Sequence, residues 1–188
     1  MFVLLAATTA ARRGELCGLR WSDIDLTEPL VEITRAIIIV DGNWQVAPTK
    51  TRQTRRVALD PVTVEALRAH QRRGETRACL AGLGLRSDGF VFSRDPDGGR
   101  PWRPDSTSRA FRHLCYDAGL DHVRLHDLRH FVATRLLASG VDVRTVSGRL
   151  GHSLASTTLN VYAAFVPDAD RHAAHVISRL VTGGTAAA

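Results

Sequence analysis

The chain carries 25 lysines and arginines, and Lys50 is the only lysine among them. An arginine keeps its proton under any ordinary condition, so it can hold a phosphate but cannot protonate a departing oxygen. A lysine can do both, which makes Lys50 a candidate general acid. The alternative is that Lys50 is an ordinary surface residue on the tip of a hairpin.

A histidine and an arginine form a second candidate group, on a helix expected over residues 126–139. The apolar stripe of this helix is Leu125, Leu128, Val132 and Leu136. His126 and Arg129 project to one side of that stripe, within a sector of roughly 60° on the helical wheel. Such a position lies at the edge of a cleft, where water screens a charge less. For each residue alone, a structural histidine and a surface ion pair are the alternatives.

The spacing of His126 and His130 also matches a helical pair of zinc ligands. The glutamate of such a motif is missing, because residue 127 is Asp127, and the sequence shows no obvious third ligand. We therefore predict no metal site. His130 lies further from the apolar stripe than His126, so it either supports the site indirectly or is solvated.

A histidine after a glycine and a later tyrosine complete the set of candidates. His152 follows Gly151 at a predicted helix junction, where little side-chain bulk obstructs a ligand. Tyr162 is one of two tyrosines and lies ten residues later. Its hydroxyl could act as a nucleophile. A single tyrosine on a short helix more commonly packs in a core.

In this order the residues resemble the C-terminal signature of the tyrosine recombinases, or phage-type integrases. The signature reads His126-x-x-Arg129, Gly151-His152 and Tyr162. Upstream, residues 9–16 resemble the first-arginine motif of that family, in which Arg12 is the arginine. Lys50 falls where the family keeps a lysine on a β-hairpin. The resemblance covers residues 1 to about 166.

The resemblance implies site-specific recombination of DNA through a covalent intermediate. The hydroxyl of Tyr162 would attack a DNA phosphate and give a 3′-phosphotyrosine and a free 5′-hydroxyl. Lys50 would protonate the departing 5′-oxygen as the general acid. The 5′-hydroxyl of a second strand would reverse the step, so the reaction needs no metal, ATP or other cofactor.

The other site residues would hold the phosphate. Arg12 and Arg129 would bind its non-bridging oxygens, and His152 would donate a further hydrogen bond. His126 would either take the tyrosine proton or hold the phosphate, and both roles stay open. The family also implies double-stranded DNA as the partner, with a monomer in its absence and a homo-oligomer, a tetramer in the synapse, on DNA.

The composition predicts one globular domain with a polyanionic partner. A chain of 188 residues with 44% hydrophobic content can bury a core. The net charge of +6 and the pI near 10.2 favour a nucleic acid or a membrane surface. Three cysteines without metal-like spacing favour the reduced cytoplasm. Nucleoid association is expected from the DNA partner that the resemblance implies. The apolar run over residues 1–7 is too short to span a membrane, and no membrane association is expected.

The predicted fold is α+β and mainly helical, as in the catalytic domain of a tyrosine recombinase. Helices are expected over 2–20 with a break near 10–14, 60–81, 105–118, 126–139, 142–150, 156–165 and 168–181. A small antiparallel three-stranded sheet is expected near residues 30–59. Its strands are 30–40, 44–47 and 55–59, with a hairpin signal at Asp41-Gly42. Lys50 then lies on the connection into the third strand.

Residues 1–181 are predicted to form one catalytic domain, followed by a disordered tail over 182–188. Because the first-arginine motif begins at residue 9, the domain's first helix and the family's DNA-clamping domains are expected to be absent. The helix over 168–181 would dock on a neighbouring subunit or on its own core. Ala10 replaces a glycine common in the family, and a positive φ there would cost about 1 kcal/mol.

Three other functions are compatible with parts of this pattern. A non-catalytic DNA-binding remnant would keep the site residues but lack the surface needed to clamp a duplex. A type IB topoisomerase shares the chemistry but relaxes supercoils without exchanging partners. A phosphatase or metal hydrolase built on the histidines would depend on a metal ion.

Overall fold

The computed structural model describes residues 1–153, 156, 158–159, 174 and 176–178. Its helices are α1 (Phe2–Thr9), α2 (Arg13–Cys17), α3 (Pro61–Leu80), α4 (Pro104–Asp117), α5 (Leu125–Ala138) and α6 (Val143–Leu150), with a short 3-10 helix at Trp21–Asp23. These bounds confirm the predicted helices as far as residue 150. The helices expected over 156–165 and 168–181 lie mostly outside the described residues, and the tail over 182–188 lies entirely outside them.

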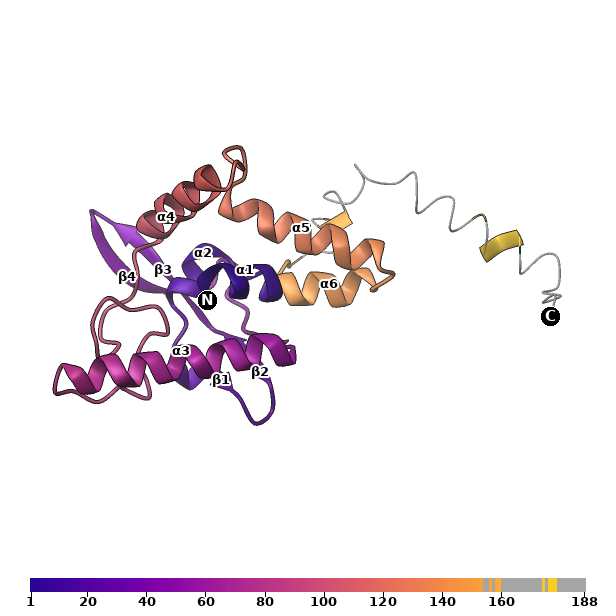
Figure 1. Ribbon diagram of the computed structural model, residues 1–188. Helices are drawn as coiled ribbons and strands as arrows, with labels where there is room; N and C mark the ends of the chain where they lie inside the picture. The colour runs from indigo at the N-terminus through magenta and orange to yellow at the C-terminus, as the bar shows by residue number, and fades with distance from the viewer. Residues whose placement is uncertain (154–155, 157, 160–173, 175, 179–188) are drawn as a thin grey trace.

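The strands form two antiparallel units (Figure 1). A three-stranded sheet has the order β1 (Ile24–Asp25), β2 (Leu30–Ile33) and β5 (Arg55–Ala58), and a separate ribbon pairs β3 (Arg35–Val40) with β4 (Asn43–Pro48). The predicted class, mainly helical with a small three-stranded antiparallel sheet, is confirmed.

The strands that form this sheet are not the three that were predicted. The strand expected over 30–40 is divided at Thr34, and its first half pairs with β1 and β5 while its second half pairs with β4. Val31 and Ile33 alternate into the core, whereas β4 is almost entirely exposed. The hairpin turn at Asp41-Gly42 is confirmed, with φ values of 49° and 77°.

Lys50 lies in a turn between β4 and β5 that is tied at its base. The hydroxyl of Thr49, a buried residue, donates to the Gln53 carbonyl at 2.8 Å, and the Arg52 N–H donates to the Thr49 carbonyl at 2.8 Å. Arg52 adopts a positive φ of 55°. The turn therefore has a fixed base, while Lys50 itself is exposed.

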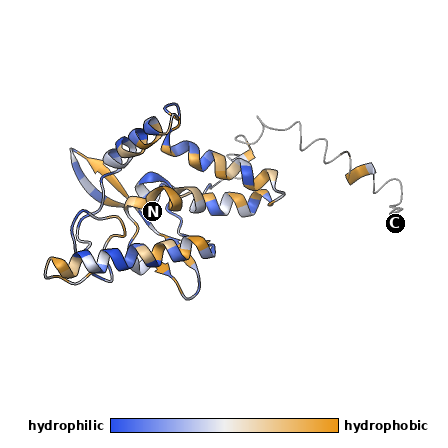
Figure 2. Ribbon diagram, in the orientation of Figure 1, coloured by the Kyte–Doolittle hydropathy of each residue, from blue (hydrophilic) through white to orange (hydrophobic). Residues whose placement is uncertain are grey.

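Two apolar clusters hold these elements together. The larger cluster includes Leu5, Val31, Val57, Leu67 and Phe92, from α1, β2, β5, α3 and the segment after α3. The smaller cluster consists of Ala10, Val132, Ala133, Val146 and Leu150, and joins the end of α1 to α5 and α6. The predicted stripe on α5 is confirmed, since Val132 is buried and Leu125, Leu128 and Leu136 pack against these clusters. Hydrophobic and hydrophilic residues alternate along α5 and α6 (Figure 2).

Ala10, the residue that follows α1, adopts the left-handed conformation. Its φ is 54°, its ψ is 23°, and its N–H donates to the Ala6 carbonyl at 3.1 Å. The alanine is fully buried in the smaller cluster, so apolar contacts offset part of a strain of about 1 kcal/mol. The sharp end of α1 lets Arg12 serve as the N-cap of the next helix. None of the helices in the described part of the chain has the length and apolar character that crossing a bilayer requires.

Candidate active site

One pocket brings together five of the six predicted catalytic residues. Its volume is about 520 Å³. The residues of the predicted site that line it are Arg12, Lys50, His126, Arg129 and His152, and His130 lies beside them. They come from the start of α2, the turn before β5, helix α5 and the end of α6. Tyr162, the predicted nucleophile, lies outside the described residues.

Arg129 is a buried charge, with 5% of its surface exposed. Its Nη1 donates to the Ala10 carbonyl at 2.6 Å and its Nη2 donates to the Leu150 carbonyl at 2.5 Å. These carbonyls lie at the C-terminal ends of α1 and α6, where the helix dipoles favour a cation. Burial, followed by the charges of Arg12 and Arg55, lowers the pKa of Arg129 to about 9. The guanidinium is therefore charged at neutral pH, in surroundings that screen it little.

Arg12 is the N-cap residue of helix α2, and Glu15 of that helix holds it in place. Its backbone N–H donates to Glu15 Oε2 at 2.8 Å, and its Nη1 donates to Glu15 Oε1 at 2.9 Å. Its Nη2 donates to the Gly151 carbonyl at 3.3 Å. The side chain is 24% exposed, and a guanidinium has five N–H groups. Donors that these bonds leave unused can therefore reach a ligand in the pocket.

Glu15 is a buried carboxylate that links two arginines of the site. Arg55 Nη2 donates to Glu15 Oε2 at 2.6 Å and Arg55 Nη1 donates to Glu15 Oε1 at 3.2 Å, with the side chains 7% and 1% exposed. Burial alone would raise the pKa of Glu15, but the hydrogen bonds and charge of Arg55, together with the hydrogen bonds of Arg12, lower it. Glu15 is thus an ionised counter-charge for both arginines.

Gly151 lets Arg55 approach the end of α6. Its φ is +67°, and a Cβ at this position would lie 2.8 Å from Arg55 Nη1. Arg55 Nε also donates to the Arg149 carbonyl at 3.0 Å. The space left by the glycine, which the sequence suggested would serve a ligand, is occupied by the Arg55 side chain.

His152 is neutral at pH 7. Burial, followed by the charges of Arg129 and Arg12, lowers its pKa to about 4. Its backbone N–H donates to the Ser147 carbonyl at 3.0 Å, and its Nδ1 lies 2.8 Å from Thr158 Oγ1. The ring is therefore held on two sides, by its main chain and by a hydroxyl.

His126 and His130 pack edge to face, with ring centroids 4.7 Å apart and planes at 89°. Both residues are largely exposed. Partial burial, followed by electrostatic interactions with His130 and Arg129, lowers the pKa of His126. A neutral imidazole can accept a proton or donate a hydrogen bond, so both predicted roles of His126 stay open. Within the described residues, no group of three or more His, Cys, Asp or Glu side chains could hold a metal ion.

Three residues that position the site escaped prediction from the sequence: Glu15, Arg55 and Arg149. Arg149 Nη2 donates to the Thr8 carbonyl at 2.7 Å and so ties α6 to α1. Glu15 has a local signal, because a glutamate at the third position of a helix commonly caps its start. Arg55 has no such signal, since its acceptors lie 40 and 94 residues away.

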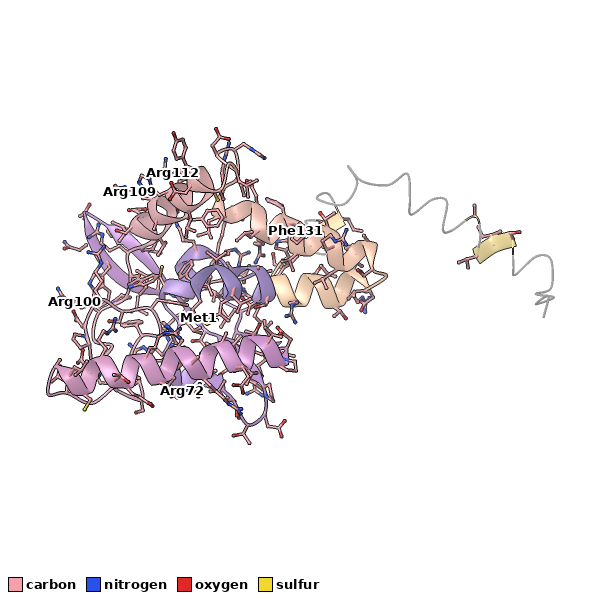
Figure 3. The ribbon with its side chains drawn as sticks, in the orientation of Figure 1. Met1, Arg72, Arg100, Arg109, Arg112 and Phe131 are labelled. Carbon is pink, nitrogen blue, oxygen red and sulfur yellow. The ribbon has the colours of Figure 1, made fainter. Side chains whose placement is uncertain are left out.

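A wider groove of about 850 Å³ adjoins the pocket and shares Arg12, His126 and Arg129 with it. Its further polar and charged lining residues are Arg13, Ser108, Arg112, Asp121, His122 and Arg124. Arg109 and Arg112 project from α4 (Figure 3). Positive charge therefore extends from the pocket along the groove.

Relatives of this chain are found among integrases and recombinases. The ICEBs1 integrase of Bacillus subtilis is 29% identical over 181 residues, which cover 96% of this chain and 48% of the relative. A XerC-like tyrosine recombinase of Caldanaerobacter subterraneus subsp. tengcongensis is 31% identical over 191 residues, which cover 94% of this chain and 48% of the relative. The chain spans about half the length of these relatives.

Solved structures share the fold. The Tn1549 transposon integrase in complex with transposon right end DNA has a TM-score of 0.76 at 20% identity, covering 94% of this chain and 57% of that chain. The XerA recombinase has a TM-score of 0.66 at 27% identity, covering 89% of this chain and 53% of that chain. Residues 1–167 match the phage integrase family, and the chain belongs to that family.

Proposed function

We propose that this chain is the catalytic domain of a tyrosine recombinase, which cleaves double-stranded DNA at a specific site and rejoins it through a 3′-phosphotyrosine. The observation that carries the proposal is the single pocket in which Arg12, Lys50, His126, Arg129 and His152 meet. Relatives that carry the names integrase and tyrosine recombinase support it. The phosphotyrosine conserves the energy of the phosphodiester, so neither a metal nor ATP is required.

Phosphate binding is the task of the basic groups in the pocket. Arg129 supplies a poorly screened charge, and Arg12 supplies N–H donors on the pocket side. His152 donates a further hydrogen bond. Together they stabilise the charge that develops on the non-bridging oxygens as phosphorus becomes pentacoordinate.

The bond changes involve Tyr162 and Lys50. The Tyr162 oxygen forms a bond to phosphorus as the bond from phosphorus to the 5′-oxygen breaks. The tyrosine proton passes to His126 or to water, and the Lys50 ammonium gives a proton to the 5′-oxygen. Lys50 suits that task because it lines the same pocket as Arg12 and His152 from a turn with a tied base.

The DNA duplex occupies the basic groove that adjoins the pocket. Arginines on α2 and α4 and beside α5 line this groove, where they can contact backbone phosphates. Residues 1–181 form the catalytic domain, with 182–188 as a tail. The chain is a monomer without DNA and a homo-oligomer on DNA, with a tetramer in the synapse, and it works at the nucleoid.

The test is the covalent intermediate. The full chain is incubated with nicked suicide duplexes that carry candidate sites, and a denaturing gel is searched for a protein–DNA adduct. We expect an adduct with the wild type, in the presence of a chelator as well, and none with Tyr162→Phe. The matched control is Tyr116→Phe on α4, whose side chain is exposed and whose adduct should be unchanged.

Two outcomes would contradict this proposal. Binding to DNA without an adduct on any site would leave a DNA-binding protein without recombinase chemistry. An adduct formed by Tyr162→Phe would show that another group is the nucleophile.

A further inference from the structure

Three side chains form a hydrogen-bonded relay at the end of α6. Ser147 Oγ lies 2.8 Å from Thr158 Oγ1, and Thr158 Oγ1 lies 2.8 Å from His152 Nδ1. Thr158 is fully buried and Ser147 is 6% exposed. Because both hydroxyls are shielded from water, the hydrogen bonds inside the relay decide where their protons lie.

The protons of the relay can be arranged in three ways, because a hydroxyl has one proton and can accept two hydrogen bonds. In the first, Ser147 donates to Thr158 and Thr158 donates to His152 Nδ1. In the second, the Nδ1–H group donates to Thr158 and Thr158 donates to Ser147. In the third, Ser147 and the Nδ1–H group both donate to Thr158. Within the part of the chain that the structure describes, the second arrangement leaves the Ser147 proton without an acceptor, and the third leaves the Thr158 proton without one. A buried donor without an acceptor costs about 1–3 kcal/mol, which favours the first arrangement.

The first arrangement determines which ring nitrogen of His152 is protonated. His152 is neutral, because its pKa is lowered to about 4, and a neutral imidazole carries one N–H. If Nδ1 accepts from Thr158, that N–H is on Nε2. The ring lines the pocket beside Arg12 and Arg129. There an Nε2–H group can donate to an anion, whereas an unprotonated Nε2 would repel it.

We propose that Thr158 is a positioning residue that, together with Ser147, holds His152 in its Nε2–H tautomer, ready to donate a hydrogen bond to a phosphate in the pocket. The identity of the anion rests on the proposed function, whereas the tautomer does not. Thr158 also lies four residues before Tyr162 in the sequence, so the relay joins the segment leading to the nucleophile to α6.

The tautomer can be measured without DNA, on the full chain at pH 7. The ¹⁵N resonances of a labelled His152 ring distinguish a protonated from an unprotonated nitrogen. We expect a protonated Nε2 and an unprotonated Nδ1 in the wild type. Thr158→Val keeps the shape but removes the hydroxyl, and should populate the Nδ1–H tautomer. Thr158→Ser keeps the hydroxyl and should restore the wild-type pattern.

The rate of adduct formation gives a second readout. Partners that orient metal-bound histidines are worth about 10- to 100-fold in function, and we expect Thr158→Val to slow the adduct by a similar factor. Thr158→Ser should recover most of the rate. The matched control is Thr145→Val, which removes an exposed hydroxyl from α6 and should leave tautomer and rate unchanged.

Different results would overturn the proposed relay and the proposed function. A wild-type His152 with its proton on Nδ1 overturns the relay, and so does a Thr158→Val variant with an unchanged tautomer. The wild-type spectrum decides the matter even if Thr158→Val does not fold. If the tautomer is as expected and no adduct forms on any site, the relay stands and the recombinase proposal falls.

Discussion

Two sets of ionisable groups at the site, one buried and one exposed, are held in different ways. In the buried set, Glu15 pairs with Arg55, and Arg129 donates to main-chain carbonyls. The exposed set consists of Lys50, His126 and His130. In the proposed reaction, the charge that binds a phosphate is fixed before any substrate arrives, as electrostatic preorganisation requires. The groups proposed to exchange protons stay in contact with water, which can replace those protons.

The largest effect should follow from removing the buried counter-charge. Glu15→Gln leaves Arg12 and Arg55 without their carboxylate, and breaking a buried ion pair costs about 3–5 kcal/mol. The free energy of unfolding from urea denaturation should fall by this amount. The matched control is Glu65→Gln, which breaks an exposed pair with Arg68 and should cost less than about 1 kcal/mol. Equal losses in the two variants would show that burial does not strengthen the pairs of Glu15.

The stability lost in Glu15→Gln should also depend on pH. The pKa of Glu15 is lowered on folding, so its stabilisation is fully present above the unfolded value of about 4.5 and is lost as the pH falls through the folded value. The difference in unfolding free energy between the wild type and Glu15→Gln should therefore be constant above that pH and shrink below it. A difference that persists at low pH would contradict an ionic origin.

A smaller loss of stability is expected where Arg55 meets Gly151. Gly151→Ala and Gly140→Ala both place an alanine at a positive φ, which costs about 1 kcal/mol. Only the first brings a Cβ within 2.8 Å of Arg55, whereas nothing lies within 4 Å of a Cβ at residue 140. Gly151→Ala should cost about 2–3 kcal/mol, since it also disturbs a buried hydrogen-bonded group. Identical losses in urea denaturation would show that Arg55 moves aside freely.

His152, which is partly buried, should produce a more gradual effect. Its folded pKa is about 4 and its ordinary value is 6.5, so the unfolded chain binds more protons between these values. The contribution of His152 to stability should be fully present above about pH 6.5 and decline as the pH falls towards 4. NMR titration of the ring should give a midpoint near pH 4, and Arg12→Gln should raise it by removing a nearby charge. A midpoint near 6.5 would contradict the burial and charge effects.

The smallest effect on stability is expected at the exposed Lys50. Lys50→Ala should change the free energy of unfolding by less than about 0.5 kcal/mol, yet slow strand cleavage by about 10²- to 10⁴-fold. A DNA substrate with sulfur in place of the departing 5′-oxygen should restore cleavage, because sulfur leaves without a proton. Lys50→Arg keeps the charge but cannot act as an acid, so it should behave like Lys50→Ala on both substrates. If Lys50→Ala cleaves the sulfur substrate as slowly as normal DNA, Lys50 is not the general acid.

The residues that line the pocket could be predicted from the sequence better than the residues that hold them in place. Arg12, Lys50 and His152 stand out by residue type and by order along the chain, and the pocket unites them. Arg55 acts through partners far away in the sequence, and only the folded chain shows that it reaches Glu15. The division of the expected strand over 30–40 has the same cause. Its β-branched residues predict one strand, whereas the pairing of β2 with β5 is long-range.

The anchoring of Arg129 has a consequence for how this site tolerates change. Its acceptors are the main-chain oxygens of Ala10 and Leu150, and an alanine scan would pass over both, because every residue type supplies the same carbonyl. Only a change in the path of the main chain, or an ester in place of an amide, would weaken these bonds. Very different side chains can therefore maintain the anchor, provided that both helices end where they do.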